Sequence, residues 1–148
     1  MSSSPSTPQA LAQAVTQAMW ARDPAVQQLG MQLLTVRPGY ALLSMRVRHD
    51  MLNGHAICHG GFIFTLADSS FAYACNSYNH NTVASGCNID FLAAAQEGDE
   101  LQAEAIERSL SGRTGIYDVA VRTAEGKTVA LFRGKSLRIQ GQVIEGLE

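Results

Sequence analysis

One carboxylate, Asp68, interrupts the apolar run from Phe62 to Cys75. Apolar neighbours remove an aspartate partly from water, which favours its neutral form and makes the anion more reactive once it forms. Such a carboxylate can act as a general base toward water, or it can attack a carbonyl carbon itself. The alternative is a structural Asp68 that pairs with a backbone group or a buried arginine.

Two glycines, Gly60 and Gly61, follow His59 and precede Asp68. If a helix begins here, the N–H groups of its first turn have no partner within the helix, and the positive end of the helix dipole adds to them. Glycine lets a substrate come close to that backbone because it has no side chain. The pattern therefore predicts that Gly60 stabilises negative charge on a carbonyl oxygen.

The spacing between Gly60 and Asp68 bears on oligomeric state. Eight residues separate the two, so they lie about 12 Å apart along one helix and do not reach the same carbonyl group. If both act on one carbonyl, they come from two chains whose central helices lie side by side about a two-fold axis. The spacing predicts a homodimer with two equivalent sites.

Hydrophobic periodicity predicts the elements that hold these residues. In chain order we expect a helix from Thr7-Pro8 to about Asp23-Pro24, a helical turn over 25–29, a hairpin over 31–48, a central helix over 60–76, and strands over 83–92, 101–110, 116–123 and 128–139. The central helix is apolar nearly all the way round, which indicates burial on every side. One buried helix among contiguous strands predicts an α+β fold in which an antiparallel sheet wraps around that helix. We expect a disordered tail over 1–7 and a single domain over 8–148.

The composition and charge of the chain indicate which classes of partner to expect. Charged residues make up only 16% of the 148, against about 25% in ordinary soluble domains, which suggests surface covered in an oligomer. The net charge is −2 and the basic residues are scattered, so we expect no nucleic-acid partner. Residues 1–9 lack the features of a secretory signal, and the run 62–75 is shorter than a membrane span of ~20 residues. We expect a cytoplasmic protein with no membrane partner.

The cysteines and histidines do not predict a metal site. Cys58, Cys75 and Cys87 have neither disulfide nor zinc-site spacing, so reduced thiols are expected. His55 and His59 lie beside Cys58, but no fourth ligand is spaced to close a tetrahedral site.

Five segments together resemble the hot-dog fold acyl-CoA thioesterases and, more narrowly, their PaaI type from bacterial phenylacetate degradation: LNGHAICHGG, LADSSFAYACNS, VASGCNIDFL, TGIYDVAV and KTVALFRGKS. The similarity runs from about Gly30 to Ile144. It implies a hot-dog fold and hydrolysis of aromatic acyl-CoA thioesters, such as (hydroxy)phenylacetyl-CoA, to the free acid and CoA. It also implies a dimer of dimers, and no cofactor besides the CoA of the substrate.

The resemblance assigns roles residue by residue. Asp68 matches the catalytic carboxylate, and Gly60 matches the glycine whose N–H binds the thioester oxygen. Asn53 and His59 match two further residues of the family's site. Some relatives place a Ser or Thr near the attacking water, and Ser85 is the nearest candidate here. The alternatives are that Asn53 only holds its turn and that His59 only caps or orients the loop.

Cations for the CoA phosphates are expected on or beside the late strands: Arg108, Arg113, Arg133, Lys135 and Arg138. The alternative for each is a solvated strand face. Aromatic residues of the central helix are candidates for an acyl pocket, although most of them must belong to the core: Phe62, Phe64, Phe71 and Tyr73.

Two other functions occur on this fold. A non-catalytic acyl-CoA binding or sensing domain would keep the cleft but tend to lose the carboxylate, and no DNA-binding helix pair is attached here. A dehydratase or hydratase pairs a catalytic His with an acid, and the helix after Gly60 contains no His. Asp68 therefore favours the thioesterase.

Overall fold

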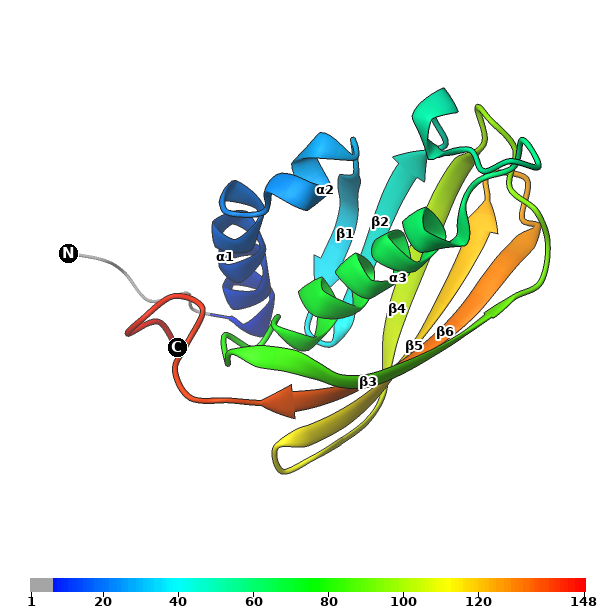
Figure 1. Ribbon diagram of the computed structural model, residues 1–148. Helices are drawn as coiled ribbons and strands as arrows, with labels where there is room; N and C mark the ends of the chain where they lie inside the picture. The colour runs from blue at the N-terminus through cyan, green and yellow to red at the C-terminus, as the bar shows by residue number, and fades with distance from the viewer. Residues whose placement is uncertain (1–6) are drawn as a thin grey trace.

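The computed structural model describes residues 7–148, and its main feature is a sheet curved around one long helix, α3 (Figure 1). The elements are α1 (Pro8–Ala21), α2 (Pro24–Gln28), β1 (Gln32–Arg37), β2 (Tyr40–Arg46), the 3-10 turn η1 (His49–Met51), α3 (Gly60–Cys75), β3 (Thr82–Phe91), β4 (Glu100–Ser111), β5 (Thr114–Thr123) and β6 (Thr128–Arg138). The predicted order of elements is confirmed. The tail predicted over 1–7 lies outside the described residues except for Thr7, which caps α1.

The six strands form one antiparallel sheet in the order β1-β2-β4-β5-β6-β3. β3 therefore pairs with β6 rather than with β4, its successor in the chain. Within residues 7–148 its other edge is unpaired, and Figure 1 shows β3 at the border of the sheet beside α3. An unpaired edge strand offers its backbone groups to another chain.

Local signals explain where the first helices begin. The Thr7 hydroxyl accepts a hydrogen bond from the Ala10 N–H at 3.0 Å, and Pro8 occupies the first turn. Asp23 caps α2 in the same way, since its carboxylate accepts from the Val26 N–H at 3.3 Å. None of the helices in the described part of the chain is long and apolar enough to cross a membrane.

Strand alternation places the core beneath α3. Leu43 and Met45 of β2 are fully buried, and so are Val119 and Val121 of β5. The inward side chains of both strands pack under the helix. On β5 the alternate residues are mostly half-buried, whereas on β2 Ser44 of the other face is buried as well.

One chain by itself does not bury α3 on every side. Its sheet-facing side is buried, for example at Leu66 and Phe71, but Gly61 is exposed and Thr65 and Asp68 are only half-buried. The sheet covers one side of the helix, and nothing else in the described chain covers the other side fully. An apolar helix with one open side indicates a surface that a partner can cover.

Candidate active site

The N-terminal end of α3 has one free backbone donor. His59 is the N-cap, and its Nδ1 accepts a hydrogen bond from the Gly61 N–H at 2.9 Å, while the Phe62 N–H donates to the His59 carbonyl at 3.0 Å. The Gly60 N–H has no acceptor among residues 7–148. The observed contact of His59 is therefore that of a helix cap, and the donor left for a ligand belongs to Gly60.

Asn53 lies beside Gly60 in the loop before α3. Its Oδ1 accepts from the His55 N–H at 2.9 Å and from the Ile57 N–H at 3.4 Å, so this oxygen holds the turn. Its side-chain amide N–H groups have no acceptor in the described chain. Asn53 and Gly60 line the same cavity of about 380 Å³, so the structure brings these two predicted residues together.

Asp68 is a half-buried carboxylate without a protein partner. No donor within residues 7–148 binds it, and burial raises its pKa above the ordinary value. Burial also raises the pKa of Cys87 on β3, and the charge of Asp68 raises it further. A carboxylate that is partly desolvated and unpaired is suited to accept a proton or to attack an electrophile.

Gly60 and Asp68 do not meet within one chain. Both lie in the same uninterrupted helix, α3, so the helical rise separates them by about 12 Å. One chain therefore does not bring the predicted backbone donor and the predicted carboxylate to the same point.

Ser85 lies in a β-bulge of the edge strand. The register of β3 against β6 shifts between Ala84 and Gly86, which leaves Ser85 as the extra residue. Its hydroxyl donates to the Lys135 carbonyl at 3.2 Å, and no hydrogen bond joins it to Asp68. The role carried over to Ser85 stays a prediction that no contact within this chain supports.

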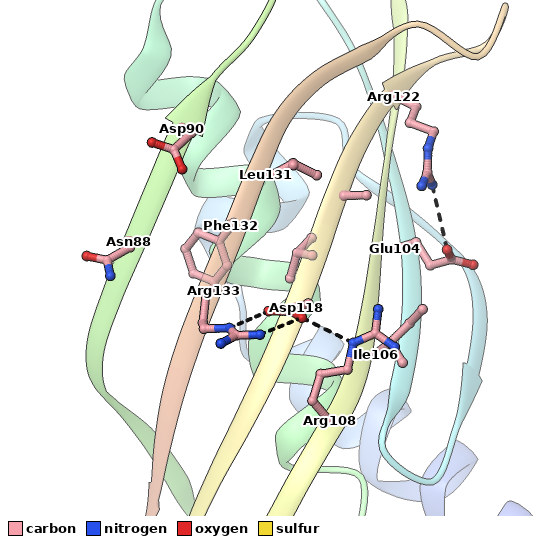
Figure 2. Close-up of a pocket in the computed structure, with 12 residues that line it drawn as sticks. Asn88, Asp90, Glu104, Ile106, Arg108, Asp118, Arg122, Leu131, Phe132 and Arg133 are labelled. Carbon is pink, nitrogen blue, oxygen red and sulfur yellow. Dashed lines mark hydrogen bonds and ion pairs between the residues drawn. The ribbon is translucent and has the colours of Figure 1, made fainter.

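Two of the predicted CoA cations share one carboxylate on the sheet face opposite α3 (Figure 2). Arg133 binds Asp118 through Nε at 2.7 Å and Nη2 at 2.9 Å, and the Arg108 Nε binds the same carboxylate at 3.1 Å. The hydrogen bond from Arg133 contributes most to lowering the pKa of Asp118. These two cations are neutralised in part by Asp118, while Lys135 is exposed on β6.

Arg113 lies at a different place, near the start of β5. Its Nε and Nη2 both donate to the Arg138 carbonyl at 3.2 Å. Together with His80, these arginines line two adjoining cavities of about 200 and 430 Å³, whose described linings contain no carboxylate. The predicted set of phosphate-binding cations therefore divides into a paired group and an unpaired group. His80, which no sequence motif marks, joins the unpaired group.

The aromatic residues of α3 divide similarly. Phe71 and Tyr73 are buried, and Phe71 packs against the rings of Tyr117 and Phe132 at centroid distances of 5.5 and 5.8 Å. These are core residues. Only Phe62 and Phe64 are half-buried, so they are the helix aromatics that a substrate could reach.

The described residues contain no group of three or more His, Cys, Asp or Glu side chains placed to hold a metal ion. The histidines beside Cys58 have other surroundings: His59 caps α3, and His55 is exposed. Burial raises the pKa of Cys58 to about 11, which favours its thiol form.

Comparison with known proteins agrees with this architecture. The model of the thioesterase superfamily matches residues 55–130. The acyl-coenzyme A thioesterase PaaI of Escherichia coli (strain K12) is 48% identical over 126 residues, which are 85% of this chain and 90% of that protein.

Solved structures show the same similarity. The E. coli PaaI protein from the phenylacetic acid degradation operon superimposes with a TM-score of 0.90 at 45% identity, over 92% of this chain and 99% of that chain. A mutant of the phenylacetic acid degradation protein PaaI from Thermus thermophilus superimposes with a TM-score of 0.76 at 42% identity, over 79% of this chain and 100% of that chain. The predicted hot-dog fold is confirmed, and the chain belongs to the thioesterase superfamily as an acyl-CoA thioesterase of the PaaI type.

Proposed function

We propose that this thioesterase hydrolyses aromatic acyl-CoA thioesters, such as (hydroxy)phenylacetyl-CoA, to the free acid and CoA. The phenylacetate context of its PaaI relatives supports this substrate class. CoA is part of the substrate, and the reaction as proposed needs no further cofactor.

The observation that carries the mechanism is the contrast between an unpaired carboxylate and an unpaired backbone donor on one helix. The Gly60 N–H binds the thioester oxygen and stabilises the charge that develops on it. Asp68 takes a proton from water as the water oxygen adds to the carbonyl carbon, or it attacks that carbon itself. The C–S bond then breaks, and the sulfur leaves as CoA thiolate, which takes up a proton.

Each site combines Asp68 of one chain with Gly60 of the partner subunit. The separation of about 12 Å along α3 supports this arrangement, because one chain does not present both groups to one carbonyl. The half-buried side of α3 and the unpaired edge of β3 lie beside each other, and they provide the surface for a second copy about a two-fold axis (Figure 1). Two such dimers then associate, as the family resemblance implies.

The CoA phosphates bind at Arg113 and Arg138, with His80 beside them. Support comes from the absence of any carboxylate in the described linings of the two cavities that these residues share. Arg108 and Arg133 are less suited, because Asp118 already occupies their guanidinium groups.

Release of thiol from a panel of CoA esters tests the proposal. We expect turnover that is fastest with aryl esters in the wild type and lost in Asp68→Ala. Ester binding without thiol release in the wild type would instead indicate an acyl-CoA sensing domain, and fastest turnover of aliphatic esters would contradict the aromatic substrate class.

Mixed dimers test the shared site. Pro is tolerated in the first turn of a helix but lacks the N–H, so Gly60→Pro removes the donor. Asp68→Asn removes the carboxylate. When the two inactive variants are mixed equally, half of the dimers are mixed and each has one intact site, so about a quarter of the wild-type activity is expected. No recovery in confirmed mixed dimers contradicts the shared site.

A single turnover in ¹⁸O-labelled water separates the two roles of Asp68. Label in the Asp68 carboxylate marks direct attack on the thioester, because water then opens the acyl-enzyme. Label in the released acid alone marks general-base catalysis only if hydroxylamine also traps no acyl-enzyme, because water that opens a mixed anhydride at the acyl carbon likewise labels the acid alone.

A further inference from the structure

An aromatic ring lies against Gly60. A methyl group on Gly60 would come within 3.0 Å of the Phe91 Cζ and 3.2 Å of its Cε1, so the ring covers the Cα of the residue with the free N–H. Phe91 is nevertheless 53% exposed. A large apolar side chain that is half-exposed in the single chain and lies next to a hydrogen-bond donor is a candidate ligand contact.

The backbone that carries this ring is fixed on both sides. Phe91 is the last residue of β3, where it pairs with Ala130 of β6. The next N–H groups, of Leu92 and Ala93, both donate to the Val129 carbonyl at 2.8 and 3.3 Å. The Phe91 ring therefore extends from a backbone that hydrogen bonds hold in place on both sides.

Hydrogen bonds also join the segment after Phe91 to neighbouring loops, including the loop before α3. The Cys58 N–H donates to the Ala95 carbonyl at 2.8 Å, and the Lys127 ammonium donates to the Ala94 carbonyl at 2.8 Å. The position of Phe91 relative to Gly60 is thus set by hydrogen bonds rather than by contact between the two residues alone.

Phe91 and Gly60 line the cavity of about 380 Å³ that also contains Asn53. Asn53 is the one polar side chain among the residues that line this cavity: Asn53, Ile57, Cys58, Gly60, Ile63, Phe91, Leu92, Ala93, Ala94 and Ala95. An acyl group has a polar carbonyl and an apolar remainder, which matches a backbone donor surrounded by apolar walls.

We propose that Phe91 is a specificity-determining residue, whose ring forms the wall against which the acyl group packs while its carbonyl oxygen binds the Gly60 N–H. This inference rests on the proposed function and adds the residue that selects the acyl group. Aromatic rings favour offset or edge-to-face contact with another ring. Phe91 therefore favours aryl acyl groups over short aliphatic ones.

The ratio of kcat/KM for phenylacetyl-CoA to that for acetyl-CoA measures this preference. We expect Phe91→Ala to lower the ratio about tenfold, and Phe91→Leu to lower it less, because leucine keeps an apolar wall. Leu34→Ala is the matched control, since Leu34 is also a half-exposed apolar residue, at 45%, but lies on β1. An unchanged ratio in Phe91→Ala, with both rates lowered equally, would overturn the proposal.

Binding of thioether analogues of the same two esters, measured by calorimetry, needs no turnover. A lower aryl preference in Phe91→Ala supports the proposal, and the wild-type preference retained in that variant overturns it. If wild-type protein releases no thiol from any ester, the proposed function fails, while the binding ratio still decides the role of Phe91.

A double-mutant comparison tests the contact with Gly60. Gly60→Ala keeps the N–H but directs a methyl group at the ring, so we expect a large loss of kcat/KM in the wild-type background. In Phe91→Ala the methyl group has room, and the same substitution should cost about tenfold less. An equal loss in both backgrounds contradicts the contact.

Discussion

The two sides of α3 each carry a polar side chain, and the two differ in how they are satisfied. Ser70, on the sheet-facing side, is fully buried, and its hydroxyl lies 2.8 Å from the Ala103 carbonyl oxygen and 3.1 Å from that of Ala41. Asp68, two positions earlier and on the open side, is half-buried and has no hydrogen-bond partner in the described chain. Buried polar groups are usually paired, so the unpaired one indicates function and the paired one indicates stability.

Asp68→Asn should have the largest effect of the substitutions on α3, and this effect should fall on activity rather than on stability. The amide has the same shape but does not accept a proton as a base, so we expect kcat/KM to fall about 10³-fold. The thermal stability of the variant should not fall, because the substitution removes no hydrogen bond within the protein. An active Asp68→Asn, or an unfolded one, would remove the contrast with Ser70.

Ser70→Ala should show the opposite result. Loss of a buried hydroxyl that bonds backbone carbonyls should lower the free energy of unfolding by about 1–3 kcal/mol. The kcat/KM of the folded variant should stay within about twofold, since the lost hydroxyl lies on the side of the helix away from Asp68. Urea denaturation and thiol release on the same preparation check both values, and a loss of activity without a loss of stability would contradict this assignment.

The same distinction separates the two groups of arginines. Arg113→Gln with Arg138→Gln should raise KM for CoA esters about tenfold, because unpaired cations are removed from the proposed phosphate site. Arg108→Gln with Arg133→Gln is the matched control and should leave KM nearly unchanged. Short thioesters without the nucleotide should be insensitive to both variants, and equal losses on them would exclude phosphate binding.

The pH dependence of activity should show the raised pKa of Asp68. The anion is the reactive form, so kcat/KM should rise with pH through a midpoint above the ordinary value of 3.8. A midpoint at or below 3.8 would contradict a desolvated Asp68.

The raised pKa of Asp68 also predicts how the stability of the folded protein changes with pH. The folded protein holds the Asp68 proton more tightly than the unfolded chain, so stability falls as pH rises from the ordinary pKa through the raised one. Asp68→Asn should remove this fall, and it should be more stable than wild type above the window and equal below it. Urea denaturation of both proteins at several pH values between the ordinary and the raised pKa measures the difference in their free energies of unfolding. If this difference stays the same at every pH, the prediction is wrong.

Much of the helix framework could be predicted from the residues themselves. Thr7-Pro8 and His59-Gly60 mark helix starts because a cap bonds N–H groups only two or three positions away. The partial desolvation of Asp68 was also predictable, since apolar residues flank it in the chain. In contrast, the half-open side of α3 was not, because the apolar pattern is the same whether the sheet or a second chain provides the cover.

The position of Ser85 shows why parts of the site could not be predicted. In a regular strand Ser85 and Cys87 would lie on the same face, because they are two positions apart. The bulge against β6 instead makes Ser85 an extra residue, whose hydroxyl donates a hydrogen bond to the Lys135 carbonyl. The register of a strand depends on its partner, and nothing near β3 in the chain identifies that partner as β6.

Residue order alone establishes that Gly60 and Asp68 lie about 12 Å apart on one helix, because helical rise is a local repeat. Only the tertiary structure decides which groups are already paired. Asp118 meets Arg108 and Arg133 across three neighbouring strands, and Phe91 meets Gly60 across the end of the sheet. These contacts depend on strand order and register, which are set by packing between distant segments.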